Sequence, residues 1–272
     1  MALRAAADRA GLGVTPHLAQ EFLSVASGTL VGCSLGLIGG GGSVLGVPLM
    51  VYLVRVPDPH VAIGTSALGV AVNAALSLAE HARAGSVKWR CGGMYAAAGV
   101  TGAWFGSSLG KIVDGQRLLF LFALVMIVIG GVMLRRRKDA GEPAAECNVE
   151  KAPKVLSYGL VTGGFSGFFG IGGGFLIVPG LLRSTGMPML NAVGTSLVAV
   201  TAFGLTTALN YASSSLIDWG LAAAFIGGGV LGSALGARAA RSLARETGHL
   251  ATLFAMIVFC VALYMLARTA SA

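Results

Sequence analysis

Residues 36–48 read GLIGGGGSVLGVP, and residues 167–179 read GFFGIGGGFLIVP. Four glycines and the closing proline match at a constant offset of 131 residues (179 − 48 = 131), namely Gly36, Gly39, Gly41, Gly42 and Pro48 against Gly167, Gly170, Gly172, Gly173 and Pro179. Each stretch interrupts a long apolar run, and every glycine inside a helix costs roughly 1 kcal/mol relative to alanine. The pattern therefore predicts two helices that are broken at matching positions of a duplicated chain.

The composition is that of an integral membrane protein. Of the 272 residues, 55% are hydrophobic and 11% are charged, and the mean hydropathy is +0.81, whereas soluble domains carry about 25% charged residues. Several apolar runs approach the ~20 residues that span a bilayer, so a soluble protein with an unusually large core is a poor alternative. We interpret the net charge of +8 as charge of cytoplasmic loops and expect no nucleic-acid partner.

Neither a metal nor a cofactor is predicted. The chain has four cysteines, Cys33, Cys91, Cys147 and Cys260. They contain no CxxC pair, so their spacing indicates neither a disulfide framework nor a zinc site. The second glycine run fails the G-x-G-x-x-G pattern of dinucleotide-binding loops at Phe175, and no lysine follows as in a phosphate-binding loop.

The duplication extends beyond the glycine runs. Residues 64–66, Gly-Thr-Ser, match residues 194–196 (194 − 64 = 130), and Trp89 matches Trp219. The sequence therefore predicts an all-α, polytopic membrane protein of about eight to ten transmembrane segments, with two homologous halves. The expected segments are an N-terminal tail (1–20), a first transmembrane repeat (21–134), a cytoplasmic linker (135–154) and a second transmembrane repeat (155–268).

Basic residues in short loops set the expected orientation, because cytoplasmic loops carry an excess of Lys and Arg. The linker opens with four consecutive basic residues, and loop 83–90 contains three, so both are placed inside. Loops 55–60 and 212–218 then fall outside. If each broken segment makes an even number of crossings, equivalent loops lie on opposite sides, which is the pattern of an inverted repeat. If each crosses once, the repeats are parallel.

The glycine breaks are the first candidates for a binding site. A short helix that begins at Ser43 or Gly174 would point its free N–H groups and its positive dipole end at the break, which favours an anion. The two Gly-Thr-Ser triplets add hydroxyls that either cap a helix or donate to a bound oxyanion. The alternative is that the glycines only permit close helix crossing. The candidate substrate-binding residues are Gly39, Gly41, Gly42, Ser43, Gly64, Thr65, Ser66, Asn73, Gly170, Gly172, Gly173, Gly174, Gly194, Thr195 and Ser196.

Catalysis is not expected. Residues 164–167 spell the G-x-S-G of intramembrane serine proteases, but Ser166 corresponds to Leu35 in the first half. No acidic pair and no arginine lies in the middle of a predicted span, so coupling through a buried carboxylate has no obvious carrier. Protons are left open as a coupling ion.

The two glycine runs with their prolines, each followed by Gly-Thr-Ser, resemble the sulfite exporter TauE/SafE family of membrane permeases. The resemblance covers about residues 20–268, although the first run reads Gly-Gly-Gly-Gly-Ser where the second reads Gly-Ile-Gly-Gly-Gly. It implies a multi-pass carrier of the bacterial inner membrane that moves small sulfur-containing or organic anions, such as sulfite, thiosulfate or organosulfonates. Alternating access and a homo-oligomer are expectations. The alternatives are an anion-selective channel, a serine hydrolase that uses Ser166, and a non-transporting subunit.

Overall fold

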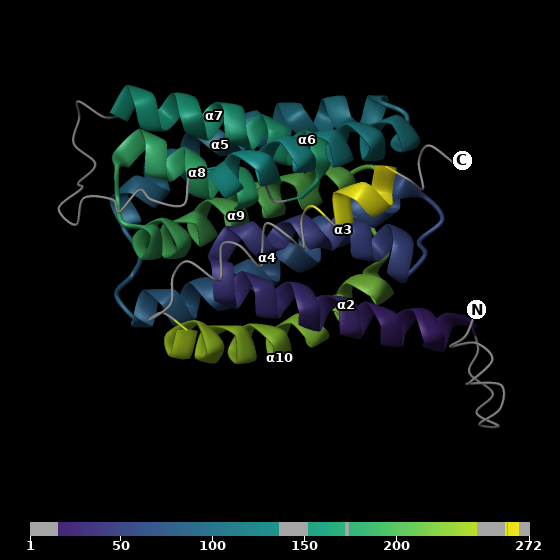
Figure 1. Ribbon diagram of the computed structural model, residues 1–272. Coiled ribbons are helices and arrows are strands. Elements are labelled where there is room, and N and C mark those ends of the chain that lie inside the picture. Colours follow the sequence, from purple (N-terminus) through teal and green to yellow (C-terminus); the bar gives the residue numbers. More distant parts are fainter. Residues whose placement is uncertain (1–15, 136–151, 172–173, 244–258, 260, 267–272) are drawn as a thin grey trace.

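The computed structural model describes residues 16–135, 152–171, 174–243, 259 and 261–266 (Figure 1). This part of the chain is helical and contains no strand, which confirms the all-α fold. Its elements are α2 (Pro16–Ile38), the 3₁₀ helix η1 (Gly39–Leu45), α3 (Gly46–Pro48), the π-helix η2 (Leu49–Leu53), α4 (Pro59–Arg83), α5 (Trp89–Ile112), α6 (Gly115–Arg135), α7 (Ala152–Phe169), α8 (Gly174–Thr185), α9 (Met189–Ala212) and α10 (Trp219–Leu243).

Four helices among the described residues are long and apolar enough to cross a membrane. They are His17–Leu37, Pro59–Arg83, Leu190–Ala212 and Trp219–Gly236. This confirms a multi-pass membrane protein. The total of eight to ten crossings stays a prediction, and the end of the expected second repeat, from residue 244 to 268, lies largely outside the described part.

Helices α4 and α9 are antiparallel neighbours. Gly64, near the start of α4, packs against Tyr211 near the end of α9, and Gly204 packs against Ala71 in the middle of α4. Most of the side chains on the two helices are buried, including Thr65, Ser66, Thr195 and Ser196. The repeated Gly-Thr-Ser triplets are therefore buried, each near the start of its helix.

Helices α2 and α10 pack through glycines. Gly28 lies against the carbonyl group of Phe225, and Gly32 lies against Gly229, so closely that a Cβ on either glycine would overlap the backbone of α10. Close approach of two membrane helices is the ordinary use of small residues. Later positions of α2 contact later positions of α10, so the two helices run in the same direction.

Helices α5 and α7 repeat this arrangement. Gly159 lies against Tyr95, and Gly163 lies against Gly99. Each α7 residue is 131 positions beyond its α2 equivalent (159 − 28 = 131), and each α5 residue is 130 positions before its α10 equivalent (225 − 95 = 130). The same parallel packing therefore occurs twice, as a duplicated sequence requires.

The loops gather at two opposite faces. Lys111 donates to the carbonyl oxygen of Asn210 (3.1 Å) and to Ser214 Oγ (2.9 Å). This places the end of α5 beside the loop after α9. We call this side of the molecule the first face, and it carries loops 54–58, 113–114 and 213–218. At the second face, Asn191 Nδ2 donates to the carbonyl oxygen of Ser86 (3.0 Å), which joins loops 84–88 and 186–188.

Helices α2 and α7 begin at opposite faces. The loop before α10 lies at the first face, and α2 runs parallel to α10, so α2 begins there. The loop before α5 lies at the second face, and α7 runs parallel to α5, so α7 begins at that face. In Figure 1, α2 accordingly starts at the right, near the label N, and α7 starts at the left.

Candidate functional site

Both glycine breaks contain a residue with a left-handed backbone. Gly39 and Gly170 have the same φ of 67°, a conformation that favours glycine because it has no Cβ. Gly39 lies against Val193 of α9, and Gly170 lies against Ile63 of α4. Val193 and Ile63 are themselves equivalent (193 − 63 = 130), so each break contacts the beginning of the central helix of the other half.

The two breaks lead into different local structures. Gly174 begins α8 as predicted, but no helix begins at Ser43. The first break is instead a 3₁₀ helix, Gly39–Leu45, which is followed directly by α3. The expectation of a helix N-terminus at Ser43 is therefore wrong. After Gly39 the glycines adopt the tighter 3₁₀ winding, so helical turns continue through the run.

The breaks meet each other at Gly40 and Gly174. A Cβ on Gly174 would overlap the Gly40 carbonyl oxygen, and a Cβ on Gly40 would lie 2.8 Å from the Cα of Gly174. Both residues are buried. The two glycine runs, predicted to be related, are thus in direct backbone contact.

Two serine hydroxyls join the breaks. The Gly174 N–H donates to Ser43 Oγ (3.2 Å), and the Gly40 N–H donates to Ser196 Oγ (3.1 Å). Ser43 Oγ in turn donates to the Gly40 carbonyl (2.9 Å), and Ser196 Oγ donates to the Val193 carbonyl (2.7 Å). Both serine side chains are fully buried. The backbone donors expected to bind an anion are present, and in this closed arrangement hydroxyl oxygens accept from them.

Thr65 and Thr195 cap helices of the opposite half. Thr65 Oγ1 accepts from the Asp218 N–H (3.0 Å) just before α10, and Thr195 Oγ1 accepts from the Lys88 N–H (2.9 Å) just before α5. These bonds lie at the first and the second face respectively. Each threonine therefore accepts from the N–H that precedes a helix of the other half, and neither caps the start of its own helix.

The other residues of the triplets contact the helices around them. Ser66 Oγ donates to the Ile63 carbonyl (3.0 Å) within α4. Gly64 packs against the Leu216 carbonyl, and Gly194 packs against Ser86, each in the loop before the helix that its neighbouring threonine caps.

The remaining glycines of the candidate set are only partly described. Gly41 is buried, and Gly42 is buried with the space of its missing Cβ beside Ser34. Gly172 and Gly173 lie outside the described residues. The site can therefore be built only from residues 39–43, Gly170 and Gly174.

Asn73 lies away from the contact between the breaks. Its fully buried amide packs where a side chain on Gly229 would stand, in the middle of α4 beside α10. Neither its Oδ1 nor its Nδ2 has a hydrogen-bond partner among the described residues. At the equivalent position of the second half, Phe203 packs against Gly99 in the same way. A polar side chain therefore replaces an aromatic one in a matched packing position.

The described residues give no support for a catalytic or metal site. Ser166 Oγ is buried and has no hydrogen-bond partner in the described part of the chain. Within the same part, no group of three or more His, Cys, Asp or Glu residues could hold a metal ion. Cys91 is disulfide-bonded, a bond that the spacing of the four cysteines does not predict.

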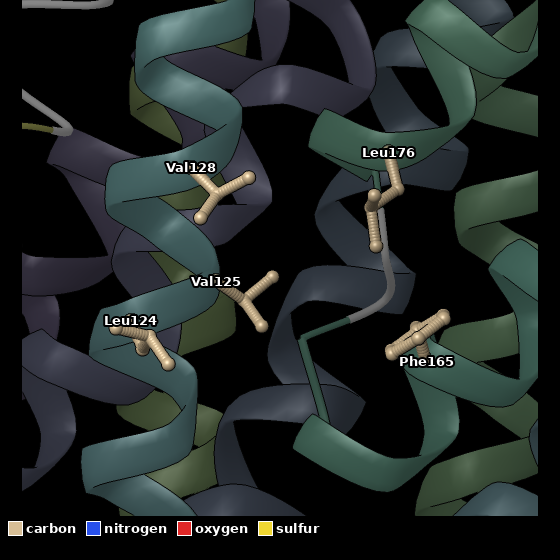
Figure 2. A pocket seen from close by; sticks show the side chains of 5 residues that line it. All are labelled: Leu124, Val125, Val128, Phe165 and Leu176. Carbon is tan, nitrogen blue, oxygen red and sulfur yellow. The ribbon is translucent and has the colours of Figure 1, made fainter.

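An apolar cavity of about 210 Å³ lies beside the second break. It is lined by Leu124, Val125, Val128, Phe165 and Leu176, from α6, α7 and α8 (Figure 2). Its lining offers no polar group for an oxyanion, so it does not serve as the anion site. A hydrocarbon chain of the surrounding lipid is the kind of molecule that such a surface accepts.

A polar cavity of about 320 Å³ opens at the first face. Its lining includes Asp58, His60, Lys111 and Asp114. Sequence reasoning missed these residues, because they lie at the ends of spans, where polar side chains ordinarily mark turns. An acid, a histidine and a lysine at the ends of two predicted spans are the signal that could have drawn attention to the cavity.

Comparison with known proteins places the chain in a family. The family model described as sulfite exporter TauE/SafE matches residues 24–265. A protein of Xylella fastidiosa strain Temecula1, named "Probable membrane transporter protein", is 49% identical over 91% of this chain and 95% of its own length. YunE of Bacillus subtilis, also named a probable membrane transporter protein, is 27% identical over 82% of this chain and 89% of its own.

The similarity extends to an archaeon. The protein MJ0441 of Methanocaldococcus jannaschii, again named a probable membrane transporter protein, is 26% identical over 71% of this chain and 73% of its own. No solved structure matches the chain significantly. The family match spans both glycine breaks and the helices that carry them, so the chain belongs to the sulfite exporter TauE/SafE family of membrane transporters.

Proposed function

We propose that this transporter moves small sulfur-containing anions, such as sulfite, thiosulfate or organosulfonates, across the bacterial inner membrane by alternating access. The observation that carries the proposal is the buried contact between the two breaks. There, the N–H groups of Gly40 and Gly174 point at serine hydroxyl oxygens. An oxyanion presents oxygens of the same hydrogen-bonding kind with a negative charge, so it forms stronger bonds to the same donors.

The substrate binds when the breaks separate. Its oxygens then replace Ser43 Oγ and Ser196 Oγ on the Gly174 and Gly40 N–H groups, and the released hydroxyls become donors to the anion. Backbone N–H groups stabilise an anion by hydrogen bonds, so the site needs no buried cationic side chain. A buried cation would be costly in a membrane. The glycines let the substrate approach the backbone closely. Gly39, Gly41, Gly42, Gly170, Gly172 and Gly173 belong to this site, and Asn73 is a further candidate in the middle of α4, away from the contact between the breaks.

Two related halves, residues 21–134 and 155–268, rock against each other in this mechanism. An inverted arrangement is supported by α2 and α7, which begin at opposite faces, and by the exchange of caps between Thr65 and Asp218 and between Thr195 and Lys88. We place the second face in the cytoplasm, because loop 83–90 carries three basic residues. Substrate sites at the meeting of broken helices are typical of such transporters.

The direct test is transport by the purified protein in proteoliposomes. Labelled sulfite, thiosulfate, a sulfonate and chloride are offered in turn, and saturable uptake with counterflow is expected for a sulfur oxyanion but not for chloride. A channel with the same site would conduct without counterflow. Absence of flux for every sulfur anion would contradict the proposed substrate class.

The site itself is tested with a matched pair of glycine variants. Gly40→Val places a branched side chain against Gly174, Val200 and Ser196, and should abolish counterflow while membrane insertion persists. Gly227→Val is the control, because no atom lies within 4 Å of its added Cβ. Unchanged counterflow in Gly40→Val would remove the breaks from the mechanism.

A further inference from the structure

Tyr211 contacts two of the side chains that line the polar cavity of the first face, His60 and Lys111. The rings of His60 and Tyr211 lie with centroids 6.4 Å apart and an angle of 33° between their planes. Lys111 Nζ stands 5.9 Å from the centre of the Tyr211 ring. His60 and Lys111 also line the cavity, so Tyr211 is connected to the aqueous face through these two neighbours.

Three buried polar atoms in this region have no partner among the described residues. They are His60 Nδ1, the Tyr211 hydroxyl and Thr207 Oγ1. Tyr211 and Thr207 are both fully buried. They are four residues apart on α9, which puts them on one side of the helix, one turn from each other. His60 and Tyr211 are in ring contact, and Thr207 lies one turn farther from the first face on α9, so the three residues follow one another as a polar row inward from the cavity.

The row passes next to the second break. Tyr211 packs against Gly64 of α4, and the neighbouring Ile63 packs against Gly170. Ile63, Tyr211 and Ile171 belong to one buried cluster. A change at Tyr211 can therefore reach the backbone of the second break through Gly64 and Ile63, and a change at His60 can reach it through Tyr211.

A structural role does not explain the two hydroxyls. A buried donor without a partner costs about 1–3 kcal/mol, and Phe and Val would fill the same volumes as Tyr211 and Thr207 without that cost. The groups that satisfy such atoms must be small, and must both donate and accept hydrogen bonds. Water meets these requirements and passes protons along a row of hydroxyls.

We propose that His60 is the protonation site that couples transport to the pH difference across the membrane, and that Tyr211 and Thr207 hold the water molecules of its proton path. This inference rests on the proposed function, because it requires a transporter to couple. Histidine is the side chain that ordinarily changes charge between about pH 5 and pH 8. His60 is the histidine that lines the polar cavity of the first face.

The proton step is simple. A hydronium ion in the cavity gives its proton to the neutral imidazole of His60 and becomes water, which leaves an imidazolium ion; the buried Nδ1 later releases a proton to water held by Tyr211 and Thr207, and that water becomes hydronium. The charged groups around His60 are Asp58, whose Oδ1 accepts from the backbone N–H of His60 (2.8 Å), and Asp114 and Lys111, which line the same cavity. A lower pH at the first face supplies more protons to the cavity and therefore promotes coupled movement.

The experiment compares two modes of transport in the same proteoliposomes. Counterflow at equal pH on both sides reports substrate binding and movement, and accumulation driven by an imposed pH difference reports coupling. In wild type both are expected. Tyr211→Phe and Thr207→Val should lose roughly tenfold in gradient-driven accumulation, the equivalent of one lost hydrogen bond, and should keep their counterflow. Thr206→Val is the matched control, because Thr206 Oγ1 already donates to the Ala202 carbonyl (2.7 Å).

Two further readouts separate coupling from folding. Tyr211→Phe removes a hydroxyl that has no described partner, so the melting temperature in detergent should not fall. His60→Gln should flatten the dependence of uptake on external pH. Wild-type counterflow with no effect of a pH difference would overturn the inference and leave the proposed function intact. Equal accumulation by wild type, Tyr211→Phe, Thr207→Val and His60→Gln would also overturn it. Absence of counterflow in wild type would instead overturn the proposed function.

Discussion

Gly40 and Gly174 lie in backbone contact, although each belongs to a different glycine run. The missing Cβ of Gly174 leaves just the space that the Gly40 carbonyl occupies. Ser43 Oγ bridges the two residues, since it accepts from the Gly174 N–H and donates to the Gly40 carbonyl. The contact therefore has a steric part, which requires glycine, and a polar part, which requires the serine.

The steric part predicts that Gly174→Ala is strongly disruptive. Its methyl group would overlap a backbone atom that cannot rotate away, and overpacking of this kind typically costs about 1–3 kcal/mol. We expect a lower melting temperature in detergent and a large loss of transport. Gly93→Ala provides the comparison, because nothing lies within 4 Å of its added Cβ; there the change should leave stability equal or slightly higher. Equal melting temperatures for the two variants would argue against the close contact.

The polar part predicts that Ser43→Ala weakens the closed arrangement. The Gly174 N–H and the Gly40 carbonyl each lose a bond in a buried place, at a cost of about 1–3 kcal/mol. A cysteine introduced at a neighbouring position should then react faster with a water-soluble thiol reagent. The apparent affinity for the anion should change as well. Ser233→Ala is the control, since Ser233 Oγ donates only to Val230 within its own helix. A rise of equal size in both variants would remove Ser43 from the closed contact.

The exchange of helix caps predicts a stability effect from Thr195→Val. The variant keeps the shape but removes the acceptor of the Lys88 N–H, and loss of a cap costs about 0.5–2 kcal/mol. Thr195→Ser should recover most of it. Thr201→Val on the same helix serves as the control, because Thr201 Oγ1 donates to Leu197 within α9. If thermal unfolding is the same for Thr195→Val and Thr201→Val, the cap contributes nothing to stability.

Much of the architecture could be predicted, because glycine and proline leave unambiguous marks in an apolar chain. The offset of 131 between the two glycine runs predicted related breaks, and Gly174 does begin a helix. The 3₁₀ winding of Gly39–Leu45 could not be predicted, because it depends on how the run packs against α2, α8 and α9. The low helix propensity of glycine disfavours an α-helix there, but it does not determine which other backbone conformation forms.

The sequence predicted which kinds of residue form the candidate site better than it predicted which residues they contact. The sequence offered each hydroxyl of the Gly-Thr-Ser triplets as a cap or a ligand, and it could not say that Thr65 reaches Asp218 or that Ser196 reaches Gly40. Those partners lie more than 150 residues away, at 153 and 156 positions, and only the packing of one half on the other brings them together. The polar cavity around His60 was missed for the same reason, since its walls come from α4, α5 and the loop before α6.

Two buried asparagines give opposite predictions. Asn210 Nδ2 donates to the Trp104 carbonyl (3.1 Å), Ser107 Oγ (2.8 Å) and Ser108 Oγ (2.8 Å) of α5, whereas both polar atoms of Asn73 lack a described partner. Asn210→Leu should therefore lower the melting temperature. The expected loss in free energy of unfolding is roughly 0.6–1.7 kcal/mol, the range measured for polar contacts between membrane helices.

Asn73→Leu should instead leave the melting temperature unchanged or raise it, because it exchanges an unpaired amide for an apolar group of similar size. If Asn73 belongs to the substrate site, the same variant lowers the apparent affinity for the anion in counterflow. Unfolding and counterflow measured on both variants separate the two roles. A destabilised Asn73→Leu variant with normal affinity would show that the amide has a structural partner and no part in binding the anion.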